Sequence, residues 1–200
     1  MCDRYKLSFT AASLALAQSV TIAQVYLDCS NWADTRKKVL DENLLGLRSP
    51  KSSVRVYREL QCRLAPLSDE EILLLVRGES ADRKALLWRA FCSRYELVRR
   101  WAQQVIVPRF RLMDRAISSS DVYAFLSREA IDHPEIEDLA DSTREKLVTV
   151  LLRTMREAGI VSKDHTILPA VLSPGVKELM CARCPDAMSV FPLLPGQAGG

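Results

Sequence analysis

The 200-residue sequence contains few residues that interrupt regular structure and none of the common catalytic motifs. Seven glycines and nine prolines are too few for a turn-rich β fold, so the composition favours helices. The two histidines, His133 and His165, have no plausible Ser, Cys or metal-ligand partner nearby in the sequence. A glycine-rich phosphate loop, a nucleophile elbow and an HExxH zinc motif are absent from the sequence. We therefore expect no enzymatic activity, no cofactor and no small-molecule substrate.

The cysteines and the acidic residues do not build a recognisable metal site either. Cys181 and Cys184 have the spacing of half a zinc site or of a redox pair, but no second cysteine pair or nearby histidine completes four ligands. The acidic stretch 132–141 lacks the ligand order and the glycine of a calcium loop. Most of the remaining cysteines lie beside or within apolar helical stretches, as small buried residues do in a reducing cytoplasm. We expect no bound metal and a cytoplasmic protein.

Charged residues are missing from 7 to 27, which is a long uncharged stretch near the N-terminus. A hydropathy scan could take it for a signal peptide or a membrane anchor. Seven Ser, Thr and Gln side chains interrupt it, however, and the apolar residues fall on one face of a helix. We interpret the stretch as a buried helix of a soluble protein, without contact to a membrane.

Helical periodicity and helix-breaking residues predict a mainly α fold in two lobes. The predicted helices run from Ser8 or Thr10 to 28, and over 33–43, 51–65, 69–77, 80–107, 121–128, 135–139, 141–158 and 174–182. A serine run at 118–120 marks the predicted boundary. Residues 1–115 would then form a basic helical bundle, residues 116–182 a smaller lobe, and residues 183–200 a disordered tail.

The smaller lobe has the element order of a winged helix-turn-helix. The amphipathic helix 141–158 ends at Gly159, and two short apolar strands, 160–161 and 166–168, follow with a polar turn between them. A helix with polar and basic residues in its first turn, followed by a small hairpin, is typical of nucleic-acid-binding modules. Thr143, Arg144 and Lys146 would begin the recognition helix, and Lys163 would lie at the tip of the wing.

The charge distribution points to the other lobe. The first 115 residues contain 20 Lys and Arg against 13 Asp and Glu, whereas residues 116–200 contain 8 against 12. Binding to a duplex requires local positive charge that displaces counterions from the phosphates. A solvated face is the alternative explanation of each basic group. The groups in the basic lobe are Arg36, Lys37 and Lys38; Lys51, Arg55 and Arg58; and Arg99, Arg100, Arg109, Arg111 and Arg115.

Several segments together resemble the BrxA family of BREX bacteriophage-exclusion systems. They are Tyr5-Lys-Leu-Ser-Phe-Thr-Ala, Trp32 with Val39 to Leu45, Leu86-Leu87-Trp88, Ser142 to Lys146 running into Arg156 to Gly159, and Leu172-Ser-Pro174. The resemblance spans residues 5–180 and rests on order and spacing. It implies a two-lobed helical cytoplasmic protein, one part of which is similar to the transcription antitermination factor NusB, that binds duplex DNA without catalysis and acts with other BREX proteins.

Three functional hypotheses remain open at this point. The first is a DNA-binding accessory of the defence system that contacts mainly phosphates through basic helical faces. The second is a protein-interaction scaffold whose winged helix docks a partner. The third is an RNA-binding protein, which the NusB-like half suggests, although few aromatic residues are identifiable for stacking on bases.

Overall fold

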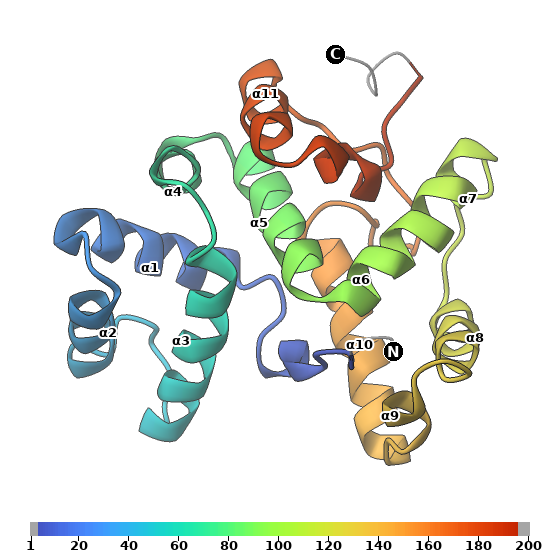
Figure 1. Cartoon of the computed structure of the whole chain (residues 1–200), viewed down its shortest axis with the longest axis horizontal. Coiled ribbons are helices and arrows are strands. Elements are labelled where there is room, and N and C mark those ends of the chain that lie inside the picture. Colours follow the sequence, from blue (N-terminus) through green and yellow to red (C-terminus); the bar gives the residue numbers. More distant parts are fainter. Residues whose placement is uncertain (1–3, 196–200) are drawn as a thin grey trace.

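The computed structural model describes residues 4–195, and this part of the chain is almost entirely helical (Figure 1). The predicted mainly α class is confirmed. The α-helices are α1 (Leu16–Cys29), α2 (Trp32–Asp41), α3 (Pro50–Leu64), α4 (Asp69–Arg77), α5 (Ser80–Arg94), α6 (Glu96–Trp101), α7 (Val107–Arg111), α8 (Ser119–Glu129), α9 (Pro134–Glu137), α10 (Asp141–Glu157) and α11 (Pro174–Arg183). Helices α1 to α4 lie on the left in Figure 1, α5 and α6 run through the middle, α7 and α8 lie on the right, and α9 lies at the lower right.

Helix ends follow local signals in the sequence. The Asn31 side chain accepts hydrogen bonds from the first backbone N–H groups of α2, and Pro50 occupies the first position of α3. Ser68 and Glu71 form the predicted capping box of α4. These signals act within four residues and need no tertiary contact, so the starts of these helices can be predicted from the sequence.

The predicted helix 80–107 is not continuous. The backbone is extended at Tyr95, which separates α5 from α6, and a π-helical turn, η2 (Ala102–Ile106), precedes α7. Pro108 was expected to end the helix, yet α7 continues to Arg111. A proline inside a helix clashes with the carbonyl four residues earlier. The wider π turn before Pro108 relieves that clash, so the helix continues beyond it.

The predicted hairpin of two strands is wrong. No β-strand forms within residues 4–195, and the pairing is limited to isolated antiparallel bridges, Val161 with Ile167 and Ala116 with Thr166. The backbone around Ile167 bonds on both sides: Ile167 N–H donates to Arg115 O at 2.7 Å and Leu168 N–H to Ile160 O at 2.9 Å. Each pairing is limited to an isolated bridge, and neither extends into a ladder.

One contiguous hydrophobic core extends from Tyr5 to Leu193. Its centre is aromatic, with Trp88, Phe91, Tyr95 and Trp101 fully buried along α5 and α6. Burying side chains of this size is the main source of stability in such a fold. No helix in residues 4–195 is long and apolar enough to cross a membrane.

The segment after α11 differs from the disordered tail that the sequence predicts. Residues Pro185–Val190 form a 3-10 helix, η3, and Trp88 donates its indole N–H to Val190 O at 2.9 Å. Phe191 is buried in the core. The apolar residues at 187–193 were the available signal for an ordered segment. Their local sequence pattern, however, does not identify Trp88 as the partner of this segment. The last part of the predicted tail, 196–200, lies outside the described residues.

The predicted first helix also begins later than expected. Residues Ser8–Ala11 form a 3-10 turn, η1, and Ala15, just before α1, has a left-handed backbone with φ of 53°. The intervening segment 12–15 is held from two sides. Arg63 of α3 donates to Ala12 O at 2.7 Å and to Ser13 O at 2.5 Å. These tertiary hydrogen bonds compete with helix formation, so local propensity alone predicts the wrong start.

Glu157 at the end of α10 holds the same segment from the opposite side. Its carboxylate accepts hydrogen bonds from the Ser13 hydroxyl at 2.9 Å, from Ala15 N–H at 3.3 Å and from Arg153 Nε at 2.8 Å. Burial on its own would raise the pKa of Glu157, but these hydrogen bonds and the charge of Arg153 outweigh it and hold the pKa below its usual value.

We expect Glu157 to contribute to the acid sensitivity of the fold. A depressed folded-state pKa means that the unfolded chain binds this proton first, so the stabilisation is present above an unfolded pKa of about 4.3 and is lost as the pH falls below it. Urea unfolding between pH 7 and pH 3 measures this loss. The Glu157→Gln variant should depend less steeply on pH in this range than the parent protein, and identical slopes would contradict the assignment.

Candidate nucleic-acid interface

Two of the three basic groups predicted within residues 1–115 lie on two packed helices, α2 and α3, beneath α1 (Figure 1). On α3, Lys51, Arg55 and Arg58 are spaced by four and three residues, so they share one side of the helix. That side lies opposite the buried residues Tyr57 and Leu60. Packing the apolar side of α3 against α1 and α5 therefore turns this basic row toward solvent.

Helix α2 adds its own cations to the edge of this row. Its buried side carries Thr35 and Val39, whereas Lys37 and Lys38 are exposed on its outer side. Arg36 lies toward α3. Burial raises the pKa of the Tyr57 hydroxyl to about 12, and the positive charge of Arg36 partly opposes that rise. Arg36 thus lies near Tyr57 of α3, the helix that packs against α2.

The shared property of these cations is that they are exposed and form no ion pair within residues 4–195. Arg48, in the connection between the two helices, has the same property and was missed by the sequence analysis. Its position between two basic segments was the available signal. We call this set the α2–α3 cationic surface. It consists of Arg36, Lys37, Lys38, Arg48, Lys51, Arg55 and Arg58.

The third basic group does not join this surface, and most of its charge is neutralised locally. Arg99 pairs with Glu96 one turn away on α6. Arg100 lies 3.2 Å from the buried carboxylate of Glu129 on α8. These arginines hold helices together or are balanced on their own helix. Their charge was visible in the sequence, but their partners were not.

Arg109 is the most constrained member of that third group. Its guanidinium donates to Asp121 at 2.7 Å and to Ala116 O at 2.7 Å, and it lies 3.5 Å from Asp114. Burial by itself would raise the pKa of Asp121, but hydrogen bonds from Ser118 and the charge of Arg109 hold it below its usual value. Arg109 thus connects α7 to the start of α8. The other two members, Arg111 and Arg115, form no ion pair within the described residues, and Arg115 lies over the ring of Phe110.

Among the candidate residues of the predicted smaller lobe, some are engaged in internal contacts and others are exposed. Arg144 of α10 donates to Ile136 O at 3.1 Å and to Glu137 O at 3.2 Å, and so binds the end of α9. Lys146 lines a groove between α10 and the segment leading into α1. Thr143 and Lys163 are exposed. At the start of α10, Arg144 is therefore engaged in an internal contact. The remaining cation, Lys146, lies near the acidic residues Asp141 and Glu145.

These contacts show which of the candidate side chains carry free positive charge. Ion pairs and carbonyl contacts occupy Arg99, Arg100, Arg109 and Arg144, whereas the cations of α2 and α3 remain available. Between residues 4 and 195 no group of three or more His, Cys, Asp and Glu side chains is placed to hold a metal ion. Cys181 is exposed, Cys184 is half-buried, and both are free thiols.

Residues 4–195 fold into a small, mainly helical protein with a surface of exposed, unpaired cations on α2, α3 and their connection. The family model "BrxA" matches residues 3–183, so the chain belongs to the BrxA family, as its sequence segments indicated. It is 22% identical over 144 residues to "BREX protein BrxA" of Escherichia coli O9:H4 (strain HS), covering 72% of this chain and 68% of that protein.

A solved structure shares the fold. The crystal structure of an uncharacterized protein from Magnetospirillum magneticum superposes with a TM-score of 0.81 and 22% sequence identity, covering 96% of this chain and 99% of that one. This likeness spans nearly the whole chain.

Proposed function

We propose that this protein is a non-enzymatic, double-stranded DNA-binding accessory of a BREX phage-exclusion system, which acts in the cytoplasm with other BREX proteins. It would bind phosphates through the α2–α3 cationic surface. The observation that carries the proposal is the set of seven exposed cations on α2, α3 and their connection, none of which forms an ion pair within the described residues. Membership of the BrxA family and the name of the Escherichia coli relative support the assignment to BREX.

Phosphate contacts of this kind give affinity but little sequence selectivity. Lysine and arginine side chains on a helical surface reach the DNA backbone and displace condensed counterions. Base readout would require side chains that enter a groove. The smaller lobe offers such an element if α8, α10 and the turn after α10 act as a winged helix, with Lys146 and Lys163 exposed toward DNA. We place this contact second, because Arg144 is engaged with the carbonyls before α10.

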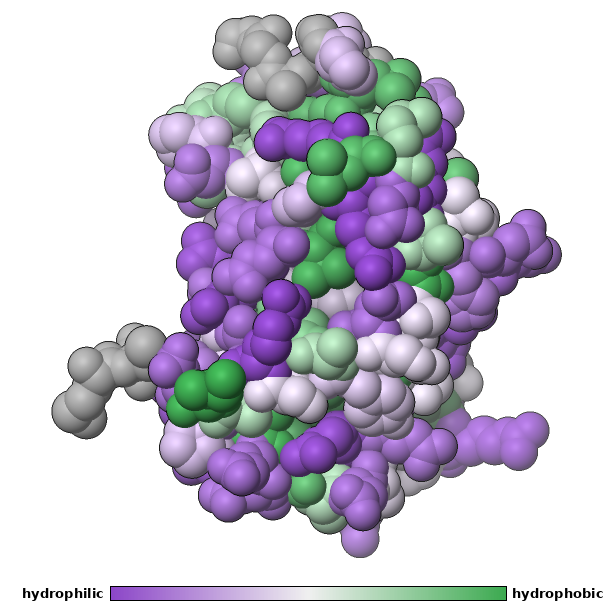
Figure 2. Space-filling model, turned by 90° about the vertical axis from the view of Figure 1, so that its right-hand side faces the viewer, coloured by the Kyte–Doolittle hydropathy of each residue, from purple (hydrophilic) through white to green (hydrophobic). Residues whose placement is uncertain are grey.

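A protein-interaction scaffold is the alternative with some structural support. Leu112, Met113, Ile131 and Val171 are exposed apolar residues. Figure 2 shows the side of the molecule that includes α7 and α8, where hydrophobic groups occur in several places between hydrophilic ones. Scattered apolar residues are common on protein surfaces, and a docking site is better indicated by one continuous patch. The third hypothesis, RNA binding, would need exposed aromatic residues for stacking, and the largest aromatic side chains here are buried.

Fluorescence anisotropy with labelled duplex DNA, single-stranded DNA and RNA tests the proposal. We expect the duplex to bind most tightly and its affinity to fall steeply with salt. If six phosphates are neutralised, log affinity against log salt should have a slope of about −5. Tighter binding to RNA would favour the third hypothesis. No binding to any of the three at low salt would overturn the proposal and favour the scaffold.

A further inference from the structure

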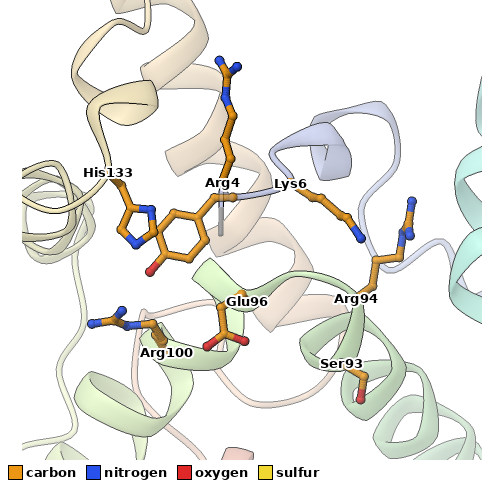
Figure 3. A pocket seen from close by; sticks show the side chains of 8 residues that line it. Arg4, Lys6, Ser93, Arg94, Glu96, Arg100 and His133 are labelled. Atoms are coloured by element: carbon orange, nitrogen blue, oxygen red, sulfur yellow. The ribbon is translucent and has the colours of Figure 1, made fainter. Parts of the chain in front are cut away.

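A cavity of about 570 Å³ opens between the N-terminal segment, the junction of α5 with α6, and the segment before α9 (Figure 3). Its lining is dominated by basic side chains: Arg4, Lys6, Arg94 and Arg100. Glu96 supplies the one carboxylate among the lining residues. This cavity lies apart from the α2–α3 cationic surface and shares no residue with it.

Tyr5 fixes the position of the cations at the entrance. Its hydroxyl donates to Glu129, its backbone N–H donates to Glu135 at 2.7 Å, and its ring stacks on His133 with centroids 3.7 Å apart. Lys6 is therefore held beside a buried anchor although its own side chain is exposed. Figure 3 shows the Lys6 ammonium directed toward the Arg94 guanidinium, whereas Arg4 points away from both.

The carboxylates around the cavity pair with Arg100 but leave Arg94 and Lys6 without a close partner. Arg100 Nε lies 3.2 Å from Glu129, whereas the buried Nε of Arg94 donates no hydrogen bond within residues 4–195. Glu59 is 4.0 Å from Arg94 Nε, at the limit of an ion pair. Lys6 forms no ion pair in the described part of the chain. Two neighbouring cations directed toward each other repel unless an anion lies between them.

We propose that this cavity binds a phosphate monoester carried on a nucleoside, with the phosphate between Lys6 and Arg94. A monoester carries a charge of about −1.5 to −2 at neutral pH and three strong acceptor oxygens. A guanidinium fork and an ammonium are the side chains that match it. The inference is independent of duplex binding by the α2–α3 cationic surface.

The nucleoside part of the ligand follows from Glu96 and from the size of the cavity. Glu96 Oε2 accepts from Arg99, and its second oxygen, Oε1, accepts no hydrogen bond within the described residues. A carboxylate oxygen beside a phosphate site suits hydroxyl donors, as acidic residues do at the ribose of bound dinucleotides. A cavity of about 570 Å³ exceeds the needs of an isolated phosphate and lies within the range of small-ligand sites.

The same chemistry occurs on a free nucleotide and on the 5′-phosphorylated end of a DNA strand, and two arms of one experiment separate these sources. Isothermal titration calorimetry would compare adenosine 5′-monophosphate with adenosine. Anisotropy would compare a 5′-phosphorylated duplex with the same duplex ending in a 5′-hydroxyl. We expect the phosphorylated member of at least one pair to bind better by on the order of tenfold, because it adds charge-assisted hydrogen bonds.

Variants connect that preference to the cavity. Lys6→Gln and Arg94→Gln should each abolish most of the preference for the phosphorylated ligand. Lys6 is exposed, so its variant remains informative if Arg94→Gln is unstable. Arg156→Gln, which removes one exposed cation from α10, is the matched control and should keep the preference. An equal response to both members of each pair, or a preference that survives Lys6→Gln, would overturn the proposal. Loss of duplex binding with the preference intact would overturn only the proposed DNA-binding function.

Discussion

Reversing the charge of Arg55 and Arg58 together is expected to weaken duplex binding by on the order of a hundredfold. Both side chains are exposed on the same side of α3 and form no ion pair within the described residues. The Arg55→Glu and Arg58→Glu changes remove two phosphate contacts and place two carboxylates against the DNA backbone. Anisotropy at two salt concentrations should show the loss, together with a salt slope shallower by about 2.

The matched control reverses two exposed charges in the other lobe. Arg156→Glu with Lys163→Glu changes the net charge by the same amount, so it separates a local contact from a general repulsion of DNA. We expect this control to retain most of the affinity. If instead the variant with Arg156→Glu and Lys163→Glu loses binding and the α3 variant does not, the smaller lobe is the DNA site and the α2–α3 assignment is wrong. Circular dichroism would check that both proteins remain helical.

Replacing Arg63 with alanine is expected to destabilise the fold by about 3–5 kcal/mol, the usual range when one partner is removed from a buried charged network. Arg63 is 4% exposed. Besides Ala12 O and Ser13 O it donates to the Tyr95 hydroxyl at 3.2 Å, and it lies over the Phe91 ring. Burial lowers its pKa to about 10, so the side chain stays charged at neutral pH. Its removal leaves two carbonyls without a donor.

Urea unfolding of Arg63→Ala at pH 7 provides the measurement, and Arg58→Ala provides the control on the same helix. Arg58 is exposed, so its truncation should change the free energy of unfolding by no more than about 0.5 kcal/mol. Equal effects of the two substitutions would show that the segment 12–15 does not depend on Arg63. Because Arg63 lies outside both proposed binding sites, duplex affinity of the folded fraction should be unchanged.

Local signals in the sequence were sufficient for most helix positions but not for the joints between helices. The Asn31 cap, Pro50 and the Ser68–Glu71 box place three helices because each acts on its own first turn. The extended backbone at Tyr95 accompanies a tertiary contact, since the Tyr95 hydroxyl donates a hydrogen bond to Glu59, 36 residues earlier. No window of neighbouring residues contains that partner, and periodicity therefore predicts one uninterrupted helix.

At the candidate interface, too, the sequence predicts what depends on composition and spacing but not what depends on tertiary contacts. The sequence identified the basic lobe and the rows on α2 and α3, because charge counts and spacing are properties of the chain itself. It could not separate Arg58, which faces solvent, from Arg109, which is held by Asp121. Both look alike in a charge count. Arg48 was overlooked because it lies alone in a connection, and only the packing of α2 against α3 brings it to the same surface.

The contact between Trp88 and the segment at 190 also constrains how the protein can be made. A ribosome delivers the chain from its N-terminus, and early segments generally begin to fold first. Helix α5, however, receives the hydrogen bond acceptor for its central tryptophan from a residue that is synthesised 102 positions later. Until residue 190 has been synthesised, part of the aromatic core of the nascent helices therefore stays uncovered. A cell that makes this protein rapidly would need either fast closure by the late segment or a chaperone that shields α5 in the interval.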